Sequence, residues 1–139
     1  MIARGVLLTA AMILAASCSN AGGTDTAIPS PGERLASASQ GLCDALGFAD
    51  QGDVTGAARE FQDRVHEYLH DLADRLSTSD RQAAGDLLEA KQRLEEALGR
   101  EPSDPSRVRD LIAELQTELG IAAGAAGLPR PTCTEDASS

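Results

Sequence analysis

The chain is poor in aromatic residues, since its 139 residues include no tryptophan, one tyrosine and two phenylalanines. It therefore has little with which to stack bases or sugar rings. Basic residues are also scarce, with 12 Lys and Arg against 22 Asp and Glu and a formal net charge of −10. Nucleic acids and anionic lipid headgroups are bound through basic patches, and none is visible in the sequence. We therefore expect no nucleic-acid partner.

Strand patterns are missing as well. No stretch combines apolar–polar alternation with β-branched or aromatic enrichment. Apolar residues instead recur at helical spacing in four stretches joined by short breaks. We predict an all-α fold, a small antiparallel bundle of four amphipathic helices within residues 31–128. The alternative is a three-helix core with a loosely packed first helix, because that helix relies mostly on alanine and contains Gly41.

Capping residues predict where the first two helices begin. Ser30 and Glu33 have capping-box spacing around Pro31, and the first helix should end at Gly47 or within 50–52. Asp53 is a natural N-cap for a helix over 54–76. The apolar stripe of that second helix comprises Val54, Ala58, Phe61, Val65, Leu69, Leu72 and Leu76. We expect Phe61, Val65, Leu69 and Leu72 to form the middle of the core.

The third and fourth helices follow the same logic. Ser79 and Gln82 have capping-box spacing at the start of the third, and Asp104 precedes a first-turn proline at the start of the fourth, which Pro129 stops. Lys91 falls on an apolar position of the third helix. Its stem is expected to lie on the core with the ammonium in water. The alternative is a pair with a carboxylate across a helix interface.

The N-terminus has the features of an export signal. Arg4 precedes an apolar run over 6–16 that is too short to span a bilayer, and small residues follow. Leu14-Ala15-Ala16-Ser17-Cys18 resembles the lipobox of bacterial lipoproteins, although Ala15 stands where leucine is more common. The resemblance implies that the signal peptide (1–17) is removed and that Cys18 carries a diacylglyceryl thioether. The alternative is an ordinary secretory signal with a chance cysteine.

Export with a lipid would place the protein outside the cytoplasm, tethered to the outer face of the cell membrane or of another envelope membrane. Residues 18–30 would then be the lipidated cysteine and a flexible tether. Without Arg4, 11 basic residues would remain against 22 acidic ones, a net charge of −11. The membrane is therefore expected as a partner through the lipid and not through the protein surface.

Export also changes how the other two cysteines are interpreted, because thiols outside the cytoplasm tend to be oxidised. With Cys18 lipidated, Cys43 and Cys133 remain as an even pair, and we predict a disulfide between them. The C-terminal tail, 129–139, would bring Cys133 back to the first helix. Closing a loop of about ninety residues stabilises a fold by roughly 2–4 kcal/mol.

One short motif could carry chemistry. His66-Glu67-Tyr68-Leu69-His70 has the form His-Glu-x-x-His, in which two histidines one helical turn apart bind zinc and the glutamate acts as general base. Asp63 or Asp74 could supply a further ligand. Zinc is therefore the alternative cofactor, and Glu67 the alternative catalytic residue.

The surroundings of the motif weaken it. Ala73 and Leu76 stand where one peptidase group has its glycine and its third histidine. On a helical wheel both histidines lie on a solvated flank beside Arg59, away from any dry cavity that a catalytic metal requires.

The sequence thus favours a non-enzymatic role, because no other nucleophile, phosphate loop or cofactor motif is readable. We predict an exported, membrane-anchored helical module that binds a protein partner not identified by the sequence, or that supports an envelope structure. The alternative is a metal-binding protein or a zinc-dependent hydrolase that uses His66, Glu67 and His70.

Overall fold

A computed structural model of the protein describes residues 28–133, and the predicted signal peptide, Cys18 and most of the tether lie outside this range. The described residues form helices joined by short turns, with no strand among them. The elements are α1 (Pro31–Asp50), α2 (Val54–Glu60), the π-helix η1 (Phe61–Val65), α3 (His66–Leu76), α4 (Arg81–Leu98) and α5 (Pro105–Ala125).

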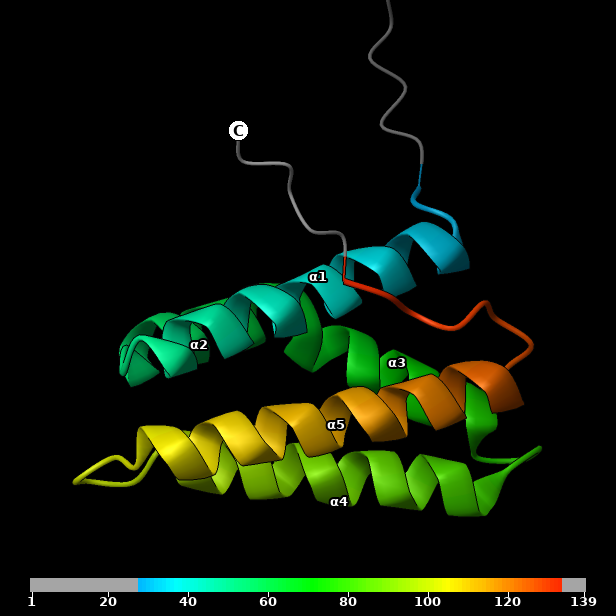
Figure 1. The fold of residues 1–139 in the computed structure, drawn as a ribbon. Helices are drawn as coiled ribbons and strands as arrows, with labels where there is room; N and C mark the ends of the chain where they lie inside the picture. Colours follow the sequence, from blue (N-terminus) through cyan, green and yellow to red (C-terminus); the bar gives the residue numbers. More distant parts are fainter. Residues whose placement is uncertain (1–27, 134–139) are drawn as a thin grey trace, which may run out of the picture.

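The helices form an antiparallel four-helix bundle, as predicted (Figure 1). The segment α2–η1–α3 runs on as one interrupted helix, which returns alongside α1. This interrupted helix also contacts α4, α4 contacts α5, and α5 contacts α1. The four helices of the bundle thus enclose one core. Within residues 28–133 no helix is both long enough and apolar enough to cross a membrane.

Side-chain caps fix the helix starts. The Ser30 hydroxyl accepts from the Glu33 N–H while the Ser30 N–H donates to the Glu33 carboxylate, which is the predicted capping box. Asp53 and Asp104 cap α2 and α5. The predicted cap of α4 was one residue off: Asp80, not Ser79, accepts from the backbone, at 3.0 Å from the Ala83 nitrogen.

The core is dominated by leucine and alanine. Phe61, Val65, Leu69 and Leu72 are at most 1% exposed, which confirms their predicted place in its middle. The first helix is packed as firmly as the others, with Leu35, Ala38, Leu42 and Ala45 all at most 2% exposed. The three-helix alternative is therefore wrong.

Gly41 explains how so alanine-rich a helix packs closely. A Cβ at Gly41 would lie 2.9 Å from both Arg64 Cβ and Val65 Cγ2 of η1. The absence of a side chain thus lets α1 approach the π-helix. The glycine that suggested a weak first helix is a point of closest contact.

The π-helix was not predicted. The His66 N–H donates to the Phe61 carbonyl, five residues back, and not to the carbonyl four residues back. A π-turn holds one more residue than an α-turn, so one helical wheel does not describe both sides of it. Ala57 is accordingly buried at 0% exposure, while the predicted Ala58 is only half-buried.

Candidate functional site

The histidine motif opens α3, directly after the π-helix. The ring centroids of His66 and His70 are 5.0 Å apart, so the structure does bring the two side chains together. His66 is not simply solvated, because its Nδ1 lies 2.8 Å from Oε1 of Glu95 on α4. Its side chain is 35% exposed and its ring meets the Phe61 ring edge-on. Of the two histidines predicted on a solvated flank, His70 is exposed and His66 is half-buried against Glu95 and Phe61.

The other predicted members of the motif do not gather around the histidines. Glu67 and Asp63 are exposed and line a groove between the start of α1 and the η1–α3 segment, which neither histidine lines. Asp74 is exposed near the end of α3. Across residues 28–133, no three or more His, Cys, Asp or Glu side chains are grouped so that they could hold a metal ion.

Glu95 connects the motif to a buried lysine. Lys91 Nζ lies 2.9 and 2.8 Å from the two Glu95 carboxylate oxygens, and Lys91 is only 6% exposed. Its ammonium is therefore not in water, contrary to the first prediction. The alternative, a pair between Lys91 and a carboxylate across a helix interface, is also wrong, because Glu95 is on the same helix as Lys91. The contact across the helix interface is the one between Glu95 and His66. The i,i+4 spacing of a lysine and a glutamate was the signal that could have revealed the pair.

The groove beside Glu67 has a volume of about 350 Å³. Arg34 forms an ion pair with Asp71 and lies 5.7 Å from the centroid of the Tyr68 ring. Tyr68 is 8% exposed, and its hydroxyl is buried without a hydrogen-bond partner among the described residues. Burial raises the pKa of Tyr68, because the phenolate would lose hydration. At the mouth of the groove, the hydrogen bond from the Ser30 backbone lowers the pKa of Glu33.

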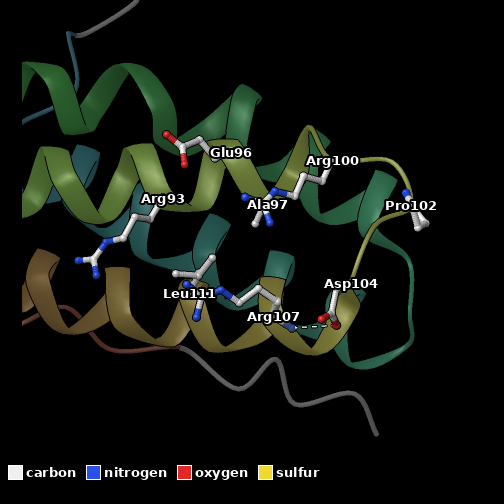
Figure 2. Close-up of a pocket in the computed structure, with 8 residues that line it drawn as sticks. All are labelled: Arg93, Glu96, Ala97, Arg100, Pro102, Asp104, Arg107 and Leu111. Atoms are coloured by element: carbon white, nitrogen blue, oxygen red, sulfur yellow. Dashed lines mark hydrogen bonds between the residues drawn. The ribbon is translucent and has the colours of Figure 1, made fainter.

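A second cavity, of about 220 Å³, lies between the end of α4 and the start of α5 (Figure 2). It is lined by Arg93, Glu96, Ala97, Arg100, Pro102, Asp104, Arg107 and Leu111. The Arg100 and Arg107 side chains both extend back along the helix pair. This group of arginines was not predicted from the sequence, although Arg93, Arg100 and Arg107 recur every seven residues.

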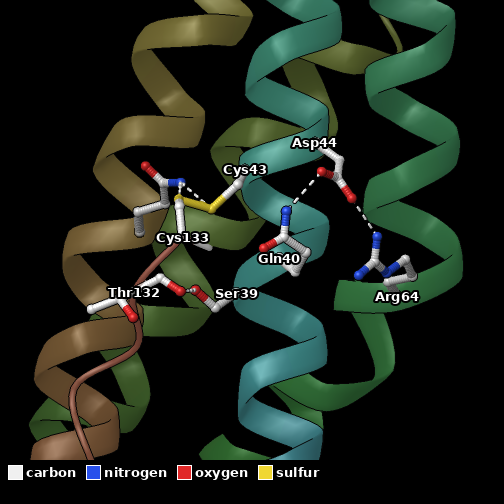
Figure 3. Close-up of a disulfide and its surroundings, with 8 residues drawn as sticks. Ser39, Gln40, Cys43, Asp44, Arg64, Thr132 and Cys133 are labelled. Carbon is white, nitrogen blue, oxygen red and sulfur yellow. Dashed lines mark hydrogen bonds and ion pairs between the residues drawn. A yellow bond between two sulfur atoms is a disulfide. The ribbon is translucent and has the colours of Figure 1, made fainter. Parts of the chain in front are cut away.

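The predicted disulfide is present and joins Cys43 to Cys133 (Figure 3). The two Cα atoms are 5.9 Å apart, within the usual range for a bridge. The Ser39 hydroxyl donates to the Thr132 carbonyl at 3.5 Å, which also holds the tail against α1. On the other side of α1, Asp44 accepts from Gln40 and pairs with Arg64 of η1.

The fold and these contacts define the class of the protein as a disulfide-closed, acidic four-helix bundle. No protein-family model, curated protein or solved structure matches the chain.

Proposed function

We propose that this chain is an exported, lipid-anchored module that acts by binding and not by catalysis. The observation that carries the proposal is the Cys43–Cys133 disulfide, which links positions 90 residues apart. Disulfides persist outside the reducing cytoplasm. This agrees with the sequence at 14–18, which resembles a lipobox and assigns the third cysteine, Cys18, to the lipid.

The shape of the bundle supports a tethered binding role. The described chain enters α1 at one end of the bundle, while the α4–α5 connection lies at the opposite end (Figure 1). In a bundle anchored through the N-terminal segment, the α4–α5 end would therefore be the end farthest from the tether. The charged cavity between α4 and α5 lies at that end.

The anchor is tested in cells that process lipoproteins. We expect the wild-type chain to incorporate labelled palmitate and to partition into the detergent phase, and Cys18→Ser to do neither. The matched control is Cys43→Ser/Cys133→Ser, which should keep both properties. Detergent partitioning that persisted in Cys18→Ser would overturn the lipid anchor.

The binding role needs its own test. The anchored wild-type protein would be cross-linked in intact membranes and purified, with an unrelated lipoprotein of similar charge as the control. Recurrent enrichment of the same partner over the control supports the proposal. Equal recovery of all proteins by both baits counts against a specific binding role.

A second candidate function is metal binding through His66 and His70. One observation favours it: Glu95 is hydrogen-bonded to Nδ1 of His66. Many metal-ligating histidines have such a carboxylate on one ring nitrogen, and the other nitrogen, here Nε2, is then available to bind the metal ion. Calorimetric titration with zinc would decide it. A stoichiometric isotherm lost in His66→Ala/His70→Ala would establish the site, and an isotherm unchanged by the double substitution would remove it.

The hydrolase form of this candidate depends on Glu67. Casein hydrolysis that was zinc-dependent and lost in Glu67→Ala would support it. Hydrolysis that survived the substitution would exclude Glu67 as the general base.

A further inference from the structure

The cavity between α4 and α5 is lined by more basic than acidic side chains, three arginines against two carboxylates, on a protein whose net charge is negative. Three of the chain's 12 basic residues, Arg93, Arg100 and Arg107, line it. Arg93 is occupied, since its Nη2 pairs with Glu114 at 2.8 Å. Arg100 and Arg107 have neither an ion pair nor a side-chain hydrogen bond with any described residue. Two free guanidinium groups therefore share one concave surface.

The two carboxylates that also line the cavity, Glu96 and Asp104, form no ion pair with these groups. Asp104 Oδ1 accepts from the backbone N–H groups of Ser106 and Arg107, at 3.1 and 3.2 Å, as the cap of α5. Glu96 accepts from the Gln92 side chain at 3.1 Å. Because the first N–H groups of α5 are already satisfied, an anion here would have to be held by the arginines and not by the helix end.

From this arrangement we infer that the cavity is a binding site for a phosphate-type oxyanion, held by Arg100 and Arg107. Guanidinium groups donate paired hydrogen bonds to phosphate oxygens. Two guanidinium groups match the two negative charges of a phosphate dianion, whereas a single carboxylate carries only one. A volume of about 220 Å³ accommodates a phosphate group together with water.

The position of the cavity indicates the source of the phosphate. It lies at the end of the bundle opposite the start of α1 (Figures 1 and 2). If the chain is anchored through its N-terminal segment, this site lies at the end of the bundle farthest from the tether. We therefore assign it to a soluble or polymer-borne phosphate and not to the headgroups of that membrane. The assignment deepens the proposed binding function by giving the class of ligand.

The test is calorimetric titration of the full chain in detergent with inorganic phosphate, at low ionic strength. We expect saturable binding at one site, weakened at least about tenfold in Arg100→Gln/Arg107→Gln. Arg75→Gln/Arg81→Gln changes the charge equally with exposed arginines outside the cavity, and should bind as the wild type does. Arg100→Lys/Arg107→Lys should retain part of the affinity, because it keeps the charge without the paired donors.

Several results would overturn the assignment. One is the absence of saturable phosphate binding to the folded wild-type chain, with folding checked by circular dichroism. Another is an equal loss in the cavity and control pairs, which would indicate a general charge effect. Sedimentation of Cys18→Ser with phosphatidylglycerol vesicles, without binding of free phosphate, would indicate lipid instead. None of these titrations depends on export or lipidation, so their failure would leave the anchored module to be judged by its own tests.

Discussion

Lys91 buries its ammonium against both carboxylate oxygens of Glu95, one turn further along α4, and the same carboxylate is hydrogen-bonded to Nδ1 of His66. We predict that Glu95→Gln lowers the free energy of unfolding by about 2 kcal/mol, because it leaves a buried ammonium without its counter-charge. The cost is smaller than for a fully enclosed pair, since Glu95 is 29% exposed. Urea denaturation measures it, with the exposed Glu89→Gln as control.

Lys91→Met gives the complementary prediction. Methionine has a similar length and no charge to desolvate, so stability should stay within about 1 kcal/mol of the wild type. A loss larger than that of Glu95→Gln would contradict this account, because it would show that the lysine contributes net stability.

The close approach of α1 to η1 predicts opposite effects at two glycines. Gly41→Ala should destabilise by about 1–3 kcal/mol, because the new Cβ would meet Arg64 and Val65 at a distance real side chains do not tolerate. Gly47→Ala, in the same helix, meets nothing within 4 Å and should gain up to about 1 kcal/mol from reduced unfolded-state entropy. Thermal unfolding of the two variants checks both. Equal effects of the two substitutions would mean that helix propensity, and not the contact between α1 and η1, determines the change in stability.

Tyr68→Phe should be neutral at pH 7 or stabilise by about 1 kcal/mol, since it removes a buried hydroxyl with no partner among the described residues. The raised pKa of Tyr68 adds a pH dependence. Above the unfolded pKa, near 10, the unfolded chain releases this proton while the folded chain retains it. Stability should therefore fall as the pH rises from the unfolded pKa to the folded one. Urea unfolding at several alkaline pH values would show a weaker decline in Tyr68→Phe than in the wild type.

Removing the disulfide should cost roughly 2–4 kcal/mol, because the unfolded chain regains the entropy of a long loop. Cys43→Ser/Cys133→Ser and reduction of the wild type should lower the urea midpoint by similar amounts. Reductant should have no further effect on the double variant. A midpoint that reductant did not move in the wild type would show that the bridge does not form.

Much of the fold follows from local patterns. Periodic leucines defined the helices, and the caps Ser30, Asp53 and Asp104 placed three helix starts. Cys43 and Cys133 were paired by counting the two cysteines that remain once Cys18 is set aside for the predicted lipid. Each of these depends on neighbours within a few residues or on simple counting.

The features that the sequence did not predict all depend on tertiary packing. The π-helix is placed where Gly41 of another helix meets it, which no single-helix wheel can represent. The contact between His66 and Glu95 joins residues on different helices. Arg100 and Arg107 come to one cavity only because the α4–α5 turn folds back, so linear charge counts reveal no basic patch.

The bridge between Cys43 and Cys133 also determines how the molecule bears mechanical load. A pull applied at both chain ends follows the shortest covalent path, from the first part of α1 across the sulfur atoms to the tail. Residues 44–132 lie outside that path. Tension can peel α1 only as far as Cys43, and most of the bundle remains shielded from force while the bridge is intact.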